Sequence, residues 1–360
     1  MEVMMTLLQL ENYQITEQIN AGQNALIYRG VRKNDSQKVV IKILRNEYPT
    51  LEQIGSLRQE YKITQTIKNS EGIVKSLELE KYQRSYALIL EDVTGKSLKQ
   101  LLAAEKLRLR EILRIFIKLA ETLGEIHKIP VIHKDIKPSN IIVNHNTGQV
   151  KLTDFGIASQ LSKENSTAGN YNFVEGTLAY MSPEQTGRMN RGIDYRSDYY
   201  SLGASLYESL TGRLPFTTKE PMELVHCHLA IKPKPPHEID PEIPEALSDI
   251  VMKLLAKNAE ERYQSAEGLK YDLEKCLQQL TNEGSIEYFL PGERDRGTQL
   301  SIPEKLYGRE EEVRKLLAAF DRVSGVLVTA PPPPPLKRGE PSKPVGQASC
   351  LSMKHSRPWT

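Results

Sequence analysis

The first ninety residues alternate short apolar runs with polar stretches, a pattern typical of strands. Residues 26–28 are apolar, and residues 39–44 form a β-branched run after a polar turn, so we expect the two runs to pair as a hairpin. Residues 51–67 instead repeat apolar side chains at helical spacing, and the run 86–90 returns to the strand pattern. This part of the chain is therefore predicted to be a small sheet with one helix.

After residue 95 the apolar residues follow a helical period. The strongest repeat covers residues 110–127, where Ile112 and Ile126 fall on one face. Two short strand-like runs interrupt the pattern, at 141–143 and 150–152. Further helical patterns cover 98–102, 197–210, 222–230, 247–256 and 265–280. We thus predict an α+β protein, with a sheet-rich first part and a larger helical second part.

Length and charge narrow the class of protein. The chain has 360 residues, which favours about two domains at roughly 150 residues each. Its 48 Lys and Arg residues nearly balance 46 Asp and Glu residues, for a net charge of +2, so we expect no nucleic-acid partner. With 39% hydrophobic residues, the whole chain is not expected to be disordered.

Cysteine usage and apolar run length bear on the compartment. Cys227, Cys276 and Cys350 are far apart and in no metal-ligand spacing, which excludes a disulfide framework and a cysteine-based zinc site. No apolar run approaches the roughly 18 to 20 residues of a membrane span. The N-terminus also has no basic segment before its apolar residues, so a signal peptide is not expected. These features predict a cytoplasmic protein without a membrane segment.

Four short segments carry the candidate chemistry, and their order is the evidence. Each alone is uninformative, since a lysine that ends an apolar strand is in most cases a solvated surface side chain. Together they resemble the eukaryotic-type serine/threonine protein kinases over about residues 13–280. The segments are Lys42 in an apolar strand, the loop with His133, Asp135, Lys137 and Asn140, the run Asp154-Phe155-Gly156, and the pair Pro183-Glu184.

The resemblance implies a two-lobed kinase fold, in which a small antiparallel sheet with one main helix precedes a larger helical lobe. It also implies ATP and Mg²⁺ as cofactors and a set of catalytic roles. Lys42 would hold the α- and β-phosphates and pair with Glu60, for which an exposed helix carboxylate is the alternative. Asp135 would orient the substrate hydroxyl group, and Lys137 would reach the γ-phosphate. Hard oxygen ligands suit Mg²⁺, and the family places them at Asn140 and Asp154.

Two positions indicate the acceptor class, and two more match structural positions of the family. Lys137 follows the catalytic aspartate by two residues, and Thr177 precedes the Pro183-Glu184 pair; both match the serine/threonine group. The partners implied are therefore protein serine and threonine hydroxyls. The structural positions are Asp198, which ties down the catalytic loop, and Arg262, which pairs with Glu184; a surface ion pair is the alternative for these.

The resemblance also places the nucleotide pocket, and here the sequence departs from the family. The expected hinge covers residues 91–93, with Glu91 and Val93 contacting adenine through backbone groups. The gatekeeper would be Leu90, and the pocket would be lined by Ile19, Ile27 and Val40. The family's phosphate loop has three glycines, but only Gly22 remains, since Asn20 and Ala25 occupy the other two positions. Glycine lets backbone N–H groups approach phosphate closely, so we expect weaker ATP binding.

A second departure concerns activation. Lys134 stands where many kinases have an arginine that receives an activation-loop phosphate, and lysine keeps the charge but loses the two-pronged geometry. Four hydroxyls remain candidates for phosphorylation, including autophosphorylation, and a polar loop without a phosphorylation site is the equal alternative. They are Ser159, Ser162, Ser166 and Thr167.

The C-terminal residues suggest a different kind of domain. The segment 306–313 and the helical pattern after it resemble the opening of an AAA-type ATPase domain, as in large cyanobacterial multi-sensor proteins that begin with a kinase domain. No phosphate loop follows, and prolines 331–335 continue neither a helix nor a sheet. We expect a truncated parent or, alternatively, a natural disordered tail. The expected division is an extension at 1–12, a kinase domain at 13–280 (lobes 13–91 and 95–280), a linker at 281–303, the truncated ATPase start at 304–330 and a proline-rich tail at 331–360.

Two functions compete on this reading. The intact catalytic set favours an active kinase in bacterial signal transduction. The eroded glycine loop favours a pseudokinase-like scaffold that binds nucleotide with little or no transfer. The sequence leaves the protein substrate, the activating signal and the oligomeric state open.

Overall fold

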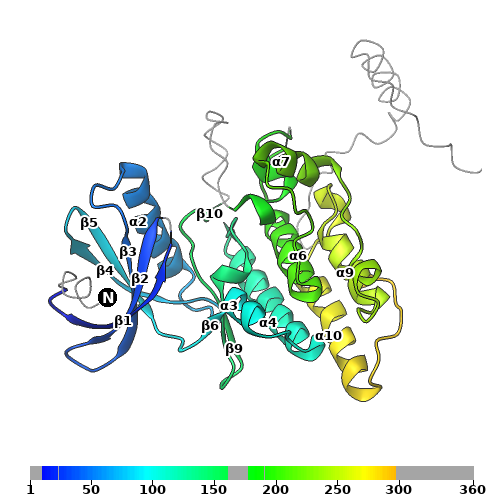
Figure 1. The fold of residues 1–360 in the computed structure, drawn as a ribbon, viewed down its shortest axis with the longest axis horizontal. Coiled ribbons are helices and arrows are strands. Elements are labelled where there is room, and N and C mark those ends of the chain that lie inside the picture. The colour runs from blue at the N-terminus through cyan, green and yellow to red at the C-terminus, as the bar shows by residue number, and fades with distance from the viewer. Residues whose placement is uncertain (1–9, 23, 161–176, 190, 297–360) are drawn as a thin grey trace, which may run out of the picture. The chain divides into compact units, whose positions relative to one another are not determined.

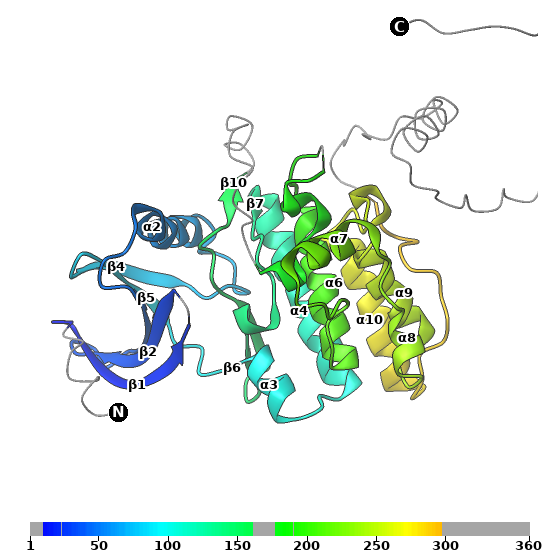
Figure 2. The same cartoon turned by 45° about the horizontal axis from the view of Figure 1, so that its top comes forward.

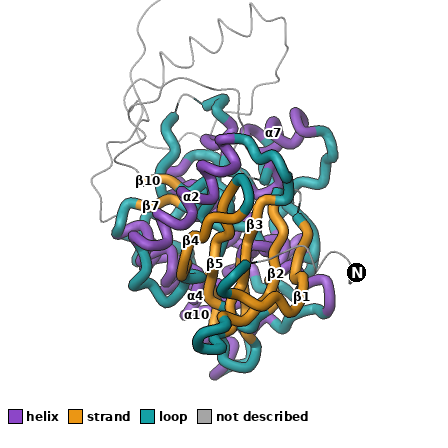
Figure 3. The backbone as a smooth tube through the Cα atoms, turned by 90° about the vertical axis from the view of Figure 1, so that its left-hand side faces the viewer, coloured by secondary structure: helices purple, strands orange, loops and turns teal. Residues whose placement is uncertain are grey.

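The computed structural model describes residues 10–22, 24–160, 177–189 and 191–296, which form two lobes joined near residue 92 (Figure 1). The first lobe is a five-stranded antiparallel sheet in the order β1-β2-β3-β5-β4, and Figure 3 shows these strands side by side. The strands are β1 (Tyr13–Ala21), β2 (Ala25–Arg32), β3 (Lys38–Leu44), β4 (Ser76–Tyr82) and β5 (Ser85–Glu91).

One helix, α2 (Leu51–Thr66), packs on this sheet against β4 and β5. It begins at Thr50, whose side chain accepts a hydrogen bond from the backbone of Gln53 while the Gln53 side chain accepts one from Thr50. This reciprocal cap satisfies two N–H groups at the helix start. Leu57 and Glu60 are both buried on the inner face, so the helix carries a carboxylate into the interior.

The second lobe is mostly helical, as Figure 2 shows. Its helices are α3 (Leu98–Ala104), α4 (Leu109–Lys128), α6 (Arg196–Thr211), α7 (Pro221–Ala230), α8 (Pro236–Ile239), α9 (Glu245–Leu254) and α10 (Ala266–Asn282). Its short strands are β6 (Lys96–Ser97), β7 (Val131–Ile132), β8 (Ile141–Asn144), β9 (Gln149–Leu152) and β10 (Ser159–Gln160). Single 3-10 turns cover Pro138–Asn140, Leu178–Tyr180, Pro183–Thr186 and Ala259–Glu261.

Helix α6 lies at the centre of this lobe and is buried along nearly its whole length. It contacts α4 on one side and α9 on another, and α4 and α9 each contact α10. Helix α9 approaches α6 closely at Gly203, where an added Cβ would lie 2.6 Å from the Cβ of Leu254. A rigid central helix of this kind gives the loops around it a fixed base.

The predicted α+β class with a small sheet lobe and a helical lobe is confirmed. The predicted hairpin, the predicted first helix and the predicted helices of the second lobe lie within a few residues of those observed. Strand β4 was missed because it is an edge strand, with Glu78 and Glu80 interrupting its apolar residues. The predicted helix near residues 310–323 lies outside the described residues.

The chain beyond α10 folds back along that helix. Phe289 joins the main core of the second lobe, and Lys275 lies over its ring at 4.1 Å. Further along, the Asp295 carboxylate accepts hydrogen bonds from the backbone of Gln264 and Ser265, at 2.7 and 2.9 Å. Residues 284–296, expected to be linker, therefore pack on the domain; we call them the C-terminal strap.

Across the described ranges we find no helix with the length and apolar character that spanning a bilayer requires.

Candidate active site

Lys42 lies between two carboxylates. Ile41 and Ile43 are buried in the core on one face of β3, so the alternation of the strand directs Lys42 to the other face. Its ammonium nitrogen is 2.7 Å from Oε2 of Glu60 and 2.8 Å from Oδ1 of Asp154. The side chains of Lys42 and Glu60 are only 12% and 2% exposed, so neither is a solvated surface group.

The electrostatics of this cluster follow from burial and pairing. The Lys42 ammonium holds the pKa of Asp154 at about 2, against its burial. Burial alone would lower the pKa of Lys42, but the two carboxylates outweigh it and raise that pKa. Burial raises the pKa of Glu60, and Lys42 opposes this. Asp154 is therefore ionised at neutral pH.

A second cluster forms around the loop that follows β7. The Lys137 ammonium donates to Oδ2 of Asp135 at 2.5 Å and to the Thr177 hydroxyl at 2.6 Å. Asn140 Nδ2 donates to the carbonyl and the carboxylate of Asp135, at 2.9 and 3.1 Å, and the Thr177 N–H donates to Oδ1 at 3.2 Å. The structure thus brings together all four of these predicted site residues.

The carboxylate of Asp198 on α6 holds the backbone of this loop through hydrogen bonds. The Asp198 carboxylate accepts from the N–H groups of His133 and Lys134, at 2.9 and 2.8 Å, and contacts Nε2 of His127 at 2.8 Å. Lys134 has a positive φ of 68°, a strained backbone conformation that persists only where the surrounding structure holds it. His133 accepts from the Asp135 N–H at 3.2 Å, so its side chain supports the backbone of the loop.

The segment Asp154-Phe155-Gly156 joins the two clusters to helix α2. Asp154 has a positive φ of 69°, and the buried Phe155 ring packs edge-on against His133 at 4.6 Å. From α2, the Ser56 hydroxyl donates to the Gly156 carbonyl at 2.8 Å, and the Gln59 side chain donates to the Ala158 carbonyl at 2.5 Å. Ser56 and Gln59 carry no sequence signal and were not anticipated.

The donor set fits a magnesium ion. Asn140 uses its Nδ2 for Asp135, which leaves its carbonyl oxygen with one contact, from the Ser139 hydroxyl at 3.3 Å. Asp154 is ionised and binds Lys42 through Oδ1. Two hard oxygen donors match part of what Mg²⁺ takes in phosphoryl-transfer sites, where phosphate and water supply the remaining ligands. The described residues contain no larger group of metal-ligating side chains.

Apolar side chains lie next to Lys42 in the sheet. Strand register pairs Ile27 with Lys42 and Val40 with Leu90. Val40, Leu90 and Val93 share one apolar cluster with Ile142 of β8, which sequence reasoning missed. Ile19, the remaining predicted lining residue, falls at an irregularity in the β1–β2 register and is half-buried.

The glycine-poor loop closes as a tight hairpin end. The Gly22 N–H donates to the Ala25 carbonyl at 2.9 Å, and the guanidinium of Arg45 donates to the Gly22 carbonyl at 3.1 Å. Asn20 pairs with Ile27 in the β1–β2 ladder. Gln23, at the tip, lies outside the described residues.

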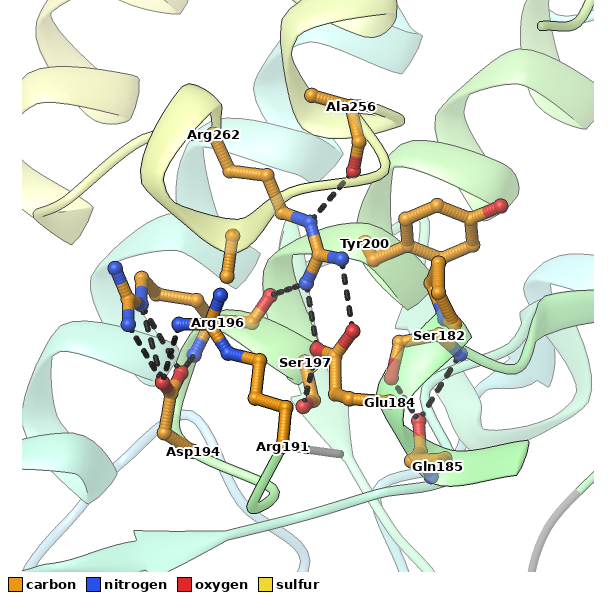
Figure 4. A network of polar contacts seen from close by, with 12 residues as sticks. Ser182, Glu184, Gln185, Arg191, Asp194, Arg196, Ser197, Tyr200, Ala256 and Arg262 are labelled. Carbon is orange, nitrogen blue, oxygen red and sulfur yellow. Dashed lines mark hydrogen bonds and ion pairs between the residues drawn. The ribbon is translucent and has the colours of Figure 1, made fainter. Parts of the chain in front are cut away.

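Below the site, Figure 4 shows a buried network around Glu184 and Arg262. Two guanidinium nitrogens of Arg262 contact the two carboxylate oxygens at 2.6 and 2.8 Å, and the Ser197 hydroxyl donates to Oε1 at 2.6 Å. The expected pairing is therefore present. The neighbouring contacts of Arg196 with Asp194 were not anticipated.

Of the four candidate phosphorylation sites, three lie outside the described residues: Ser162, Ser166 and Thr167. The fourth, Ser159, belongs to β10, where its hydroxyl oxygen is buried without a hydrogen-bond partner among the described residues. Such a hydroxyl is poorly placed to accept a phosphoryl group.

Comparison with known proteins identifies the family of this chain. The protein kinase domain family matches residues 13–273. The chain is 35% identical over 266 residues to a probable serine/threonine-protein kinase of Clostridium perfringens, covering 73% of this chain and 38% of that protein. It is 33% identical over 269 residues to the serine/threonine-protein kinase PrkC of Bacillus subtilis, covering 74% and 40%. The match thus spans less than half the length of these relatives. The chain belongs to the protein kinase family.

Proposed function

We propose that the chain is a serine/threonine protein kinase that transfers the γ-phosphoryl group of ATP to protein hydroxyls, as part of bacterial signal transduction. The observation that carries this is the contact of Lys137 with both Asp135 and Thr177. That arrangement holds one carboxylate oxygen and one ammonium group beside the place where an acceptor hydroxyl would enter. Relatives from three bacterial groups bear the same serine/threonine-kinase description.

The proposed roles follow from charge. Lys42, held by Glu60, would bind the α- and β-phosphates, since its ammonium is buried and oriented. Asp135 would accept the hydrogen bond of the acceptor hydroxyl and orient its oxygen toward the γ-phosphorus. Lys137 would neutralise charge on the γ-phosphate. Thr177 keeps Asp135 and Lys137 in register through its N–H and its hydroxyl.

Magnesium would be held by Asn140 and Asp154. When bound, it would neutralise phosphate charge and orient the β- and γ-phosphates. Adenine would lie between Val40 and Ile142, with Leu90 behind it and the backbone of Glu91 and Val93 at its edge. Ile19 and Ile27 would cover it from the phosphate-loop strands, and Gly22 would leave room for the phosphates.

The test is phosphoryl transfer from γ-labelled ATP to the protein itself and to a generic acceptor protein. We expect transfer by the wild type and a loss of about a hundredfold or more in Asp135→Asn, because the hydroxyl is no longer oriented. Asp35→Asn, in an exposed turn, is the matched control and should keep full activity. A folded, ATP-bound wild type that transfers no phosphate would overturn the enzyme function.

That outcome would favour the second candidate, a pseudokinase-like nucleotide-binding scaffold. The observation behind it is the phosphate loop, where the one retained glycine, Gly22, has its N–H bonded to Ala25 rather than free for phosphate. A thermal shift with Mg-ATP in the absence of transfer would support the scaffold.

We further propose that the kinase domain is cytoplasmic and includes the C-terminal strap, and that the start of an AAA-type ATPase domain follows it near residues 304–330. The ATPase resemblance falls on residues outside the described part of the chain. Reading the adjacent genomic frames for the remaining ATPase motifs tests it. Autophosphorylation is tested by mass spectrometry of the active protein.

A further inference from the structure

Arg29 on β2 joins the phosphate-loop hairpin to the hinge. Its Nε donates to Oδ2 of Asp92 at 2.8 Å, and its guanidinium also contacts the Glu17 carboxylate on β1. The Asp92 side chain is only 2% exposed and that of Arg29 is 29% exposed. One guanidinium therefore links both strands of the hairpin to the middle residue of the hinge.

The strand register puts Arg29 on the face of the sheet that carries Val40 and Lys42. Arg29 pairs with Val40 on β3, and Ile27 pairs with Lys42, so Arg29 and Ile27 lie two residues apart on the same face. Val40 in turn pairs with Leu90 on β5. Arg29 thus lies in the same cross-strand row as Val40 and Leu90, on the sheet face that would cover adenine in the proposed site.

The hinge itself is held on its other sides. The Asp92 carboxylate also accepts from the Thr94 N–H at 2.7 Å. The Glu91 carboxylate accepts from Lys151 at 2.6 Å, and the Val93 carbonyl accepts from Asn144 at 2.9 Å. Lys151 and Asn144 belong to the second lobe, so these contacts attach the hinge to that lobe. Arg29 attaches the β1–β2 hairpin of the first lobe to the same hinge.

We propose that Arg29 is a positioning residue for nucleotide binding, which holds the β1–β2 hairpin over the adenine pocket through Asp92 and Glu17. In a loop with three glycines, the backbone can close onto phosphate. Here one glycine remains, and the ion pair between Arg29 and Asp92 holds the β1–β2 hairpin in place instead. The inference rests on the proposed function, since it presumes that the pocket takes ATP.

An ordinary surface ion pair would contribute little, because solvent screens it. The Asp92 carboxylate is nearly excluded from solvent, so removal of Arg29 leaves it with the Thr94 N–H alone. A buried carboxylate that loses its cation is destabilised, so it either moves toward solvent or becomes hydrated in place. Either response moves the hinge residue that lies between Glu91 and Val93, and the affinity for nucleotide falls.

The test compares Arg29→Gln, Asp92→Asn and the double variant. We expect the KM for ATP to rise about tenfold in each single variant, with kcat changed less than about twofold, because the hydroxyl-orienting residues are untouched. The double variant should be no worse than either single one, since both remove the same interaction. Arg32→Gln is the matched control: Arg32 lies on the opposite face of β2 and pairs with Asp35.

Binding of Mg-ATP, measured by titration in an Asp135→Asn background, separates this inference from the proposed function. A tenfold weaker Kd in Arg29→Gln supports it even if the wild type transfers no phosphate. An unchanged KM and Kd in folded Arg29→Gln, additive losses in the double variant, or absence of ATP binding by the wild type would each overturn it.

Discussion

Arg262 and Glu184 form a two-pronged ion pair whose side chains are 0% and 2% exposed. The pair joins the segment before α10 to the segment before α6, and the Ser197 hydroxyl completes the carboxylate's shell. One residue further along α6, Asp198 holds the backbone of the catalytic loop. The base of the active site is therefore a buried charge network.

Breaking this pair should destabilise the domain strongly. Arg262→Met leaves the Glu184 carboxylate buried without its cation, so we expect the free energy of unfolding to fall by about 3 to 5 kcal/mol. Urea denaturation followed by circular dichroism measures this. Arg108→Met removes an exposed pair with Glu111 that solvent screens, so it should change the free energy of unfolding far less. Equal effects in the two variants would contradict the buried-network account.

Glu60 is expected to act on the reaction rather than on binding alone. In Glu60→Gln the Lys42 ammonium keeps only Asp154 as a charged partner, so its position over the phosphates is lost. We expect kcat/KM for ATP to drop about a hundredfold. Glu71→Gln, which removes an exposed carboxylate paired with Lys75, serves as the control and should be unaffected. A near-normal rate for Glu60→Gln would refute the role.

The second lobe should lose stability in mild acid through His228. Burial lowers the pKa of His228 from 6.5 to about 4, and its Nδ1 contacts the Tyr200 hydroxyl at 2.9 Å. Between pH 6.5 and pH 4 the His228 imidazole is therefore protonated in the unfolded chain but neutral in the folded protein. The free energy of unfolding should fall as pH drops from about 6.5 to 4, by up to about 3 kcal/mol.

Urea denaturation of the wild type and His228→Gln at pH 7 and pH 5 measures this contribution. The variant should lose less stability than the wild type between the two pH values, since it has no imidazole to protonate. His226→Gln, exposed two residues earlier, should keep the wild-type dependence. Identical pH dependence in His228→Gln and the wild type would assign the acid sensitivity to other groups.

The C-terminal strap should contribute to folding through Asp295. Its carboxylate accepts from the N–H groups of Gln264 and Ser265 and from the Ser265 hydroxyl, at the start of α10. Asp295→Ala removes these acceptors, and we expect a loss of about 1 to 3 kcal/mol in the free energy of unfolding. Glu293→Ala, exposed in the same segment, should change it by less than about 0.5 kcal/mol.

Sequence reasoning succeeded where residue order or period carries the information. The helical repeat located α4, and the motif order located Lys42, Asp135 and Asp154. It identified Glu60 and Arg262 only through family resemblance, because a buried carboxylate or guanidinium looks like a surface charge in a one-dimensional pattern.

Several of the contacts that it missed are made by single polar residues far apart in the chain. Arg29 and Asp92 are 63 residues apart, and Ser265 and Asp295 are 30 apart. Neither pair belongs to a recognisable sequence motif, and the partners come together only in the folded chain. The same is true of Ser56 and Gly156, whose contact depends on how α2 lies against the second lobe.

The strap has a practical consequence for anyone who wishes to isolate the catalytic unit. The family match ends at residue 273, inside α10, which continues to Asn282. A protein cut at 273 would lack the last turns of that helix, the Phe289 ring in the core and the carboxylate that caps Ser265. We therefore expect a fragment that ends at residue 296 to be more stable toward urea than one that ends at residue 273.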